Sequence, residues 1–507
     1  MGGVFFMLDY FLEHNVQKKL HIFSILHINH SISVKELAKE VNISSSTITT
    51  LIDELNFDLE GIAEISKDNA IITINVCEDV TFFEIFHAIY RSSNMLKCLC
   101  YMIMNDSLEP FSEFSEEHHL SRPSAYRIRQ NCVNYLREIG LDVDKNRVVG
   151  NEYRIRFLIA LLHYKYGIDC YDTDSDSIQI AREFIISTND KIDMNFLECT
   201  SAEYGYFEYL LILAWKRKKY PLTFEKSEEL ESLKQLFVFP ELKKYLQENL
   251  ENKLNISFSD RDYDYIFLVY CCTNSCVFAD KWKREDIELV HKIIFANGKV
   301  KHLIKKFENK FCLDVTQSHA FKSSIIYFYK KCFFNLHCII PDKHFYLDSK
   351  KDSSKLMVRQ CVSEMIDTWK KENHIPYPVD AGHLQYLSLQ IFSIVQQFMK
   401  PVQIFIVSDL TAELEILKLY LARKFSRHRI TIKPVLLNAQ DLSFMSELDN
   451  SVIITKKVFA HLLSTMGISK NNSIVPINIE VNELDKQAIV DALVKCEKNI
   501  FRQYVLK

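Results

Sequence analysis

Three helix-period segments followed by two short alternating segments occupy the first 80 residues, and few folds satisfy that order. Ser33 and Glu36 have the spacing of a capping box at the start of the second helix-period segment, 34–41. The alternating segments, 63–66 and 70–76, have the period of strands and flank Lys67–Asn69. Helical spacing of apolar residues predicts helices over 11–28, 34–41 and 45–57. This order predicts a winged helix-turn-helix module.

Small hydroxyl side chains crowd the start of the third predicted helix. Short polar side chains let a helix end approach the major groove of DNA, and the amide groups at a helix N-terminus favour phosphate. Capping alone also favours Ser and Thr at a helix start, so a plain helical domain is the alternative interpretation. The residues that we expect to contact DNA in this module are Ser44, Ser45, Ser46, Thr47, Thr49, Thr50 and Lys67.

The same order repeats in the next part of the chain. An apolar helix is predicted over 94–104, a short one over 111–118 and a long one from Arg122 or Pro123 to Ile139. Gly140 is a predicted C-cap, and the alternating residues 141–149 predict a second wing. The repeat predicts a second helix-turn-helix with its own recognition helix.

This second copy is basic, although the whole chain has a net charge of −4. Residues 120–156 contain eight Lys plus Arg and four Asp plus Glu. Arginine can bridge a guanine edge or bind phosphate, so we expect this module to dominate DNA affinity; the alternative is a solvated charged helix face. The residues that we expect to contact DNA here are Arg122, Ser124, Tyr126, Arg127, Arg129, Gln130, Lys145 and Arg147.

The segment Val149–Gly167, with the sequence VGNEYRIRFLIALLHYKYG, resembles the one that closes the second helix-turn-helix of Mga/AtxA-family transcriptional regulators. The resemblance covers essentially the whole chain and is strongest over residues 10–167. It implies that the N-terminal modules bind promoter DNA of virulence or adaptation genes in Gram-positive bacteria.

Successive amphipathic helices are predicted between residues 170 and 398, and the resemblance identifies two PRD-like domains there. Such domains are regulated when phosphocarrier proteins of the sugar phosphotransferase system phosphorylate histidines. No histidine lies between Tyr164 and Val290, and Tyr270 and Gln390 stand where regulatory histidines are usual. In the second of these domains we favour His319 as the acceptor, and His337, His344 and His383 rank below it.

Cys271, Cys272 and Cys276 invite a metal or redox interpretation. Zinc sites need four ligands in paired short spacings, and no CxxC or nearby histidine completes this set. Buried packing thiols are the favoured interpretation. The chain also lacks the GxxxxGK[ST], HExxH and GxSxG motifs, so we expect no metal, no cofactor and no enzyme activity.

After Pro401 the pattern changes to apolar strands separated by helices, which predicts a doubly wound parallel α/β domain. It resembles the EIIB component of phosphotransferase transporters, whose phosphorylated cysteine follows the first strand. Here Ser408-Asp409-Leu410 occupies that place, and Cys496 lies on the last helix, so we expect a homodimer surface rather than phosphotransfer. The predicted strands are 402–408, 430–437, 451–455 and 473–479, and the predicted helices are 411–425 and 483–498.

A chain of 507 residues is too long for one core, and we expect a mostly helical, multidomain protein. The 14 scattered cysteines, and the lack of a leader or of 18 consecutive apolar residues, favour the cytoplasm and no membrane. The expected partners are double-stranded promoter DNA, a second copy of the chain and phosphocarrier proteins. The alternative function is phosphotransferase-linked signalling mainly through protein–protein binding. The predicted domains are 1–80, 81–167, 168–285, 286–398 and 399–507.

Overall fold

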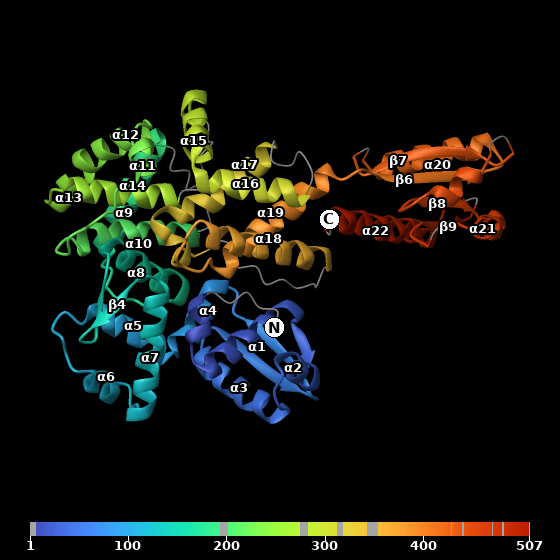
Figure 1. The fold of residues 1–507 in the computed structure, drawn as a ribbon. Helices are drawn as coiled ribbons and strands as arrows, with labels where there is room; N and C mark the ends of the chain where they lie inside the picture. The colour runs from blue at the N-terminus through green and yellow to red at the C-terminus, as the bar shows by residue number, and fades with distance from the viewer. Residues whose placement is uncertain are drawn as a thin grey trace. The chain divides into compact units, whose positions relative to one another are not determined.

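The computed structural model describes residues 7–192, 201–273, 282–311, 318–341, 353–426, 428–438, 441–468, 470–478 and 481–505. The chain forms two compact units. One comprises residues 1–301, 325–350 and 370–386, and the other comprises 302–324, 351–369 and 387–507. Most of the described residues are helical (Figure 1), as predicted. None of the described helices is long and apolar enough to cross a bilayer.

The first module has the predicted order of three helices followed by two strands. Its Ser33–Glu36 capping box is present, and Asn42 ends the second helix in the left-handed conformation. The wing is longer than expected, because its strands continue to a tight turn at Asn69 and Ala70, which both have positive φ. A three-residue strand completes a sheet of order β1-β3-β2. The elements are α1 His14–Asn29, β1 Ser31–Ser33, α2 Val34–Val41, α3 Ser45–Asp58, β2 Ala63–Asp68 and β3 Ile71–Val76, after the short η1 Met7–Phe11.

The second module follows the predicted order, with one additional helix. That helix, α4 Phe82–Arg91, was not predicted, and it opens with its own capping box between Thr81 and Glu84. The predicted C-cap Gly140 is confirmed by its φ of 76°. The other elements are α5 Asn94–Met104, α6 Phe111–Glu117, α7 Arg122–Glu138, β4 Asp142–Asp144, β5 Arg147–Val149 and α8 Glu152–Tyr166.

The middle of the chain is a succession of helices, as expected. One helical stretch is divided into an α-helical part, α12 Val238–Tyr245, and a π-helical part, η2 Leu246–Glu251. The other elements are α9 Ser175–Ile192, α10 Ser201–Lys216, α11 Glu228–Leu233, α13 Asn252–Leu254, α14 Asp260–Thr273, α15 Arg284–Ala296, α16 Gly298–Phe311, α17 His319–Tyr329, η4 Lys330–Cys338, α18 Ser353–Glu372 and α19 Ala381–Phe398.

The C-terminal domain contains a four-stranded parallel sheet of order β7-β6-β8-β9 (Figure 1), which confirms the predicted parallel α/β architecture. Two helices, α20 and α22, pack on one sheet face, while η5 and α21 pack on the other. Helix α21 was not predicted. The elements are β6 Val402–Ser408, α20 Thr411–Lys424, β7 Ile430–Leu436, η5 Ser443–Glu447, β8 Val452–Lys456, α21 Lys457–Ser464, β9 Ser473–Ile477 and α22 Glu483–Val505.

Candidate nucleic-acid interface

The hydroxyl groups at the start of α3 are arranged around a helix cap. Ser44 Oγ accepts a hydrogen bond from the amide of Thr47 at 3.2 Å and lies 2.8 Å from the hydroxyls of Ser46 and Thr47. The hydroxyls of Thr49 and Thr50 donate to backbone carbonyls one turn earlier. These side chains therefore stabilise the helix end, while their remaining lone pairs face solvent or lie near it.

The wing brings a cation to the same helix. Lys67, an exposed residue of β2, donates from Nζ to Thr49 Oγ1 at 3.4 Å. The structure thus brings Lys67 together with the hydroxyl-bearing end of α3. A phosphate or a base edge bound there would meet one positive charge and several small hydrogen-bonding groups.

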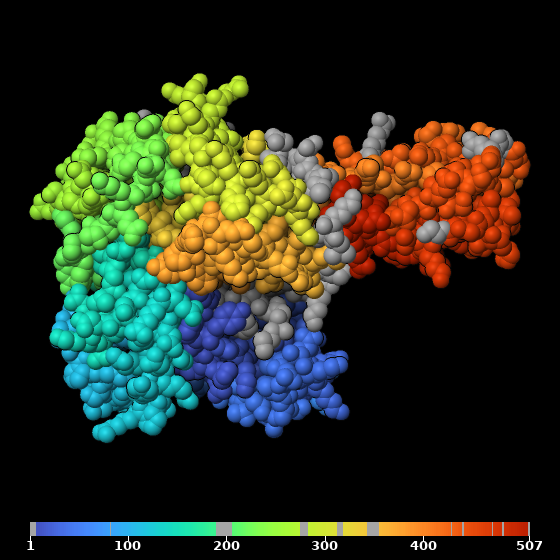
Figure 2. All heavy atoms as spheres, in the orientation of Figure 1, coloured from blue at the N-terminus to red at the C-terminus, as the bar shows by residue number. Residues whose placement is uncertain are grey.

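Helix α7 carries the predicted basic residues of the second module. Ser121 caps it, accepting from the amide of Ser124 at 3.4 Å and donating to the Ser124 hydroxyl at 3.0 Å. Arg122, Tyr126 and Arg127 are exposed, with Tyr126 at 67%. The cyan atoms of this module form part of the surface visible in Figure 2. Ser124 therefore supports the helix start, whereas the two arginines and the tyrosine are available to a ligand.

Arg129 and Arg147 lie at the second wing rather than on the outer face of α7. Arg129 Nε donates to Asn146 Oδ1 at 2.9 Å, in the left-handed turn that Lys145 and Asn146 form between β4 and β5. Arg147 Nε lies 3.8 Å from Asp106 Oδ1. Lys145 is exposed at the tip of the wing. Arg129 thus positions the wing, and Lys145 is its outermost cation.

Asp106 anchors the base of this wing to the helical region. Its carboxylate also accepts hydrogen bonds from Lys219 and Tyr220. Partial burial raises the pKa of Asp106, but the hydrogen bonds from Lys219 and Tyr220 outweigh it and hold the pKa below its usual range. The carboxylate is therefore charged at neutral pH and balances cations beside it.

The charge count over 120–156 overstates the basic surface. Arg154 and Arg156 are 2% and 0% exposed. Arg156 Nε pairs with Glu152 at 3.0 Å inside the protein, and exposed Arg137 pairs with Asp142 at 3.1 Å. Among the described residues, no acidic side chain forms an ion pair with the exposed cations Arg122, Arg127 and Lys145 of this segment. Burial removes Arg154 and Arg156 from the basic surface, and their positions in the sequence do not reveal that burial.

Sequence reasoning missed Asn134, which lies on the exposed side of α7. Gln130 Nε2 donates to Asn134 Oδ1 at 2.9 Å, so the two amides form a pair one helical turn apart. The i, i+4 spacing from a predicted contact residue was the signal that could have identified it.

The C-terminal end of α7 is held by buried contacts to the helical region. Arg154 Nε donates to the carbonyl of Ile139 at 2.9 Å, and its Nη1 donates to that of Phe334 at 2.8 Å. The same guanidinium stacks on the ring of Tyr377, with 4.7 Å between Cζ and the ring centroid. Tyr377 also lies directly against Gly140, where an added Cβ would overlap its hydroxyl group. The end of α7 is therefore held by contacts with Phe334 and Tyr377, which are distant in the sequence.

A second buried connection joins the beginning of the chain to α8. Lys165 Nζ lies 2.9 Å from Asp9 Oδ2, and the hydroxyl of Tyr90 donates to Asp9 Oδ1 at 3.2 Å. Burial lowers the pKa of Lys165 to about 8, although Asp9 and Asp380 favour its charged form. This network links η1, α4 and α8 within one unit.

The candidate phosphorylation residues differ in exposure. His319 is exposed at the start of α17, with Nδ1 3.5 Å from Ser323 Oγ. Burial lowers the pKa of His337 to about 3, and His383 is buried between Lys331 and the carbonyl of Ile340. His344 lies outside the described residues. Of the described candidates, His319 is the accessible imidazole.

Tyr270 and Gln390, which occupy the places of the usual regulatory histidines, lie on α14 and α19. Tyr270 is buried and Gln390 is half-buried. Burial raises the pKa of the Cys271 thiol to about 12, and Cys272 is buried beside it, whereas Cys276 lies outside the described residues. Within the described ranges, no group of three or more His, Cys, Asp or Glu side chains could hold a metal ion.

In the C-terminal domain, the loop after β6 is occupied by an ionic cluster. Ser408 Oγ donates to Glu413 Oε2 at 2.5 Å, and Lys456 Nζ lies 2.9 Å from Asp409 and 2.7 Å from Glu413. Hydrogen bonds from Lys456 lower the pKa of both carboxyl groups. Two carboxylates against one lysine make this loop unfavourable for phosphate, and Cys496 is buried elsewhere in the domain.

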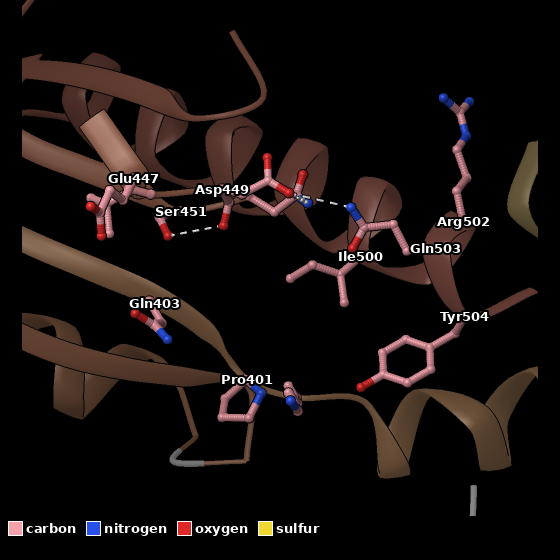
Figure 3. Close-up of a pocket in the computed structure, with 12 residues that line it drawn as sticks. Pro401, Gln403, Glu447, Asp449, Ser451, Ile500, Arg502, Gln503 and Tyr504 are labelled. Atoms are coloured by element: carbon pink, nitrogen blue, oxygen red, sulfur yellow. Dashed lines mark hydrogen bonds between the residues drawn. The ribbon is translucent and has the colours of Figure 1, made fainter. Parts of the chain in front are cut away.

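A cavity of about 800 Å³ opens at the opposite end of the strands, where the central strands β6 and β8 begin. Figure 3 shows Gln503 donating to Asp449 across it, at 3.3 Å, while the side chain of Arg502 points away from the other labelled groups. The cavity is lined by carboxylates, amides, two basic side chains and one aromatic ring, that of Tyr504, and no single ligand chemistry follows from this mixture.

Two protein-family models match this chain. One, described as the Mga helix-turn-helix domain, matches residues 78–163, and the other, described as the M protein trans-acting positive regulator (MGA) PRD domain, matches residues 180–391. The first match contains α7 with its exposed arginines. No curated protein matches the chain.

Proposed function

The chain belongs to the Mga family of transcriptional regulators, and we propose that it acts by binding duplex promoter DNA through both N-terminal modules. The observation that carries this proposal is the outer face of α7. Arg122, Tyr126 and Arg127 are exposed there, inside the matched helix-turn-helix segment. Recognition helices of this type enter the major groove with such side chains.

The two modules divide the work of binding. Arg122, Arg127 and Lys145 supply the charge that neutralises phosphates, because they are exposed and pair with no acidic side chain in the part of the chain that the structure describes. The hydroxyl-bearing end of α3 makes a second contact with the DNA. Its small side chains allow a close approach, and Lys67 supplies the positive charge there. AT-rich or easily bent DNA suits a module that has few strong base readers.

The PRD-like domains and the C-terminal domain regulate this DNA binding. With the two N-terminal modules they make up the five domains predicted from the sequence. The second PRD-like domain receives a signal from phosphotransferase phosphocarrier proteins, with His319 as acceptor, because the first PRD-like domain contains no histidine. The protein acts in the bacterial cytoplasm, and the genes that it regulates serve virulence or adaptation. The exposure of His319 supports this role. Incubating the protein with a phosphorylated phosphocarrier should label wild type but not a His319→Ala variant; equal labelling would exclude His319.

The C-terminal domain resembles EIIB components and serves as a homodimer surface without catalytic activity. Ile416 and Leu419 of α20 are 65% and 68% exposed, and Leu410, which caps this helix, is 52% exposed. Exposed apolar side chains gathered on one helix are typical of protein–protein contacts. Sedimentation of an Ile416→Asp/Leu419→Asp variant should show monomers where wild type shows dimers; unchanged dimers would place the interface elsewhere.

The test of the main proposal is binding to AT-rich, promoter-length duplexes across a salt series. Wild type should bind with an affinity that falls steeply as salt rises, because phosphate contacts release counterions. Arg127→Ala should reduce the slope of log K against log salt by about one. Arg502→Ala, which removes an exposed arginine from the C-terminal domain, is the matched control and should bind as wild type does.

Weak binding that is indifferent to salt and to Arg127→Ala would contradict the proposal. The alternative, phosphotransferase-linked signalling through protein–protein contacts, would then be the better account, because a pure protein binder has no reason to respond to either change.

A further inference from the structure

We propose that Gln130 and Asn134 act together as a reader of adenine in the major groove. This inference rests on the proposed DNA-binding function and names the base chemistry that the second module recognises. The two amides form one hydrogen-bonded unit on α7, with Gln130 Nε2 donating to Asn134 Oδ1 at 2.9 Å.

The pair lies on the side of α7 opposite the protein core. Ala125, Ile128, Cys132 and Leu136 are buried along one face of the helix. At 3.6 residues per turn, Gln130 lies near the middle of the opposite face, with Asn134 one turn further along. Arg127 precedes the pair by about one turn on the same side and is exposed. Any duplex that meets this face through Arg127 also meets the two amides.

The internal hydrogen bond leaves a defined pattern of free groups. Each amide has one acceptor oxygen and one donor nitrogen with two hydrogens. Among the described residues, no hydrogen bond uses Gln130 Oε1 or Asn134 Nδ2. The oxygen of Gln130 therefore remains as an unused acceptor and the amino group of Asn134 as an unused donor. If both amide groups were rotated by 180°, the donor and acceptor would exchange residues, but the pair would still offer one of each.

That pattern is complementary to adenine. In the major groove, adenine presents the N6 amino group as a donor and N7 as an acceptor, and asparagine or glutamine commonly binds both. Guanine presents two acceptors there, thymine an acceptor and a methyl group, and cytosine a donor. Adenine is therefore the base that satisfies both free groups of the pair.

The mutual hydrogen bond also restricts the side chains before DNA arrives. A flexible amide loses rotamer freedom when it binds, and ordering such a side chain in advance reduces that loss.

The spacing along α7 also places the contacted base. The helix rises about 1.5 Å per residue and stacked bases are about 3.4 Å apart. If α7 follows the groove, the centre of the amide pair therefore lies roughly two base-pair steps from the base pair beside Arg127.

A surface amide pair at i, i+4 also stabilises a helix slightly without touching DNA. The experiment must therefore detect the contact itself. The preferred duplex of the wild-type protein is first determined by selection from a random library. Each adenine of that duplex is then replaced by 7-deazaadenine, which lacks the N7 acceptor but keeps the base pair.

For wild type, one 7-deazaadenine position should weaken binding by about tenfold, within the range of a good base contact. The same replacement should change the affinity of Asn134→Ala and Gln130→Ala/Asn134→Ala variants by less than about twofold, since their contact is already lost. Their salt slopes should equal that of wild type, because neither amide is charged. Gln179→Ala is the matched control, since Gln179 donates to Glu183 one turn later on α9; it should keep the full penalty.

The inference is overturned if the variants keep the wild-type penalty at every position, or if their selected sequences equal that of wild type. Salt-sensitive binding of wild type with either result would leave the proposed function standing. If wild type shows no salt-sensitive binding to any duplex, the proposed function fails and this inference fails with it.

Discussion

The two N-terminal modules share a scaffold and differ in chemistry. Each places a helix beside a two-stranded wing, and each helix begins at a serine cap, Ser44 in α3 and Ser121 in α7. The outer part of α3 carries small hydroxyls and receives one lysine from its wing. The outer part of α7 carries two arginines, a tyrosine and an amide pair. The same fold thus presents two kinds of side chain on its exposed face, small hydroxyls on α3 and larger basic, aromatic and amide groups on α7.

The modules also differ in how the end of the recognition helix is held. The turn after α7 is packed against Tyr377 and hydrogen-bonded by buried Arg154. The turn after α3 contains Gly61, with no atom within 4 Å of an added Cβ. The difference indicates that the position of α7 depends on the helical region, whereas the end of α3 is more open.

The largest effect is expected from removing the Arg154 guanidinium. Arg154→Met leaves the carbonyls of Ile139 and Phe334 without this donor in a buried place, and it should lower the free energy of unfolding by about 3–5 kcal/mol. Thermal and denaturant unfolding measure this change. Arg127→Met, at an exposed position of the same module, is the control and should stay within about 0.5 kcal/mol of wild type. Equal stability of the two variants would refute the role assigned to Arg154.

Gly140→Ala and Gly61→Ala compare the two turns directly, because both glycines have a φ of 76°. Both alanines share the cost of a left-handed backbone, about 1 kcal/mol. Gly140→Ala must also displace Tyr377, which should add about 1–3 kcal/mol. Denaturant unfolding of both variants gives the difference. A cost at Gly61 as large as that at Gly140 would mean that Tyr377 does not constrain the turn.

The two caps should be equivalent, because this part of the scaffold is shared. Ser44→Ala and Ser121→Ala each remove the side-chain acceptor of a helix-end amide and should each cost about 1 kcal/mol. Ser45→Ala, next to the first cap, is the control and should cost less than about 0.5 kcal/mol. A cap effect confined to one module would show that the helix starts are not alike.

The smallest effect is expected from the contact between Arg129 and the second wing. Arg129→Ala and Asn146→Ala each break one hydrogen bond, and each should weaken duplex binding by about threefold by loosening the wing. The double variant should bind like either single one, because both act through the same contact. Additive losses in this cycle would mean that Arg129 itself contacts DNA.

The parts of the fold that sequence predicted are those that local pattern determines. The capping box at Ser33, the left-handed Gly140 and the apolar strand Val402–Ser408 depend on residues close in sequence, and all three are confirmed. Strand β1 was missed, because three residues are too few to show an alternation.

The arrangement of the candidate site depended on contacts between distant residues. Burial of Arg154 and Arg156 depends on the packing of α8, so counting charges along the chain included them in the surface. The pairing of Arg129 with Asn146 depends on how the wing folds back on α7. The Ser408–Glu413–Lys456 cluster forms because β6 and β8 pair in parallel, with Val407 opposite Thr455. None of these contacts leaves a periodic signal.

The central claim is that the second module supplies most of the charge that binds DNA. The most direct test compares the salt dependence of duplex binding for an Arg122→Ala/Arg127→Ala/Lys145→Ala variant with that for Lys67→Ala. The account predicts that the slope of log K against log salt falls by about three for the first variant and by about one for the second. A larger fall for Lys67→Ala, or no fall for the triple variant, would contradict it.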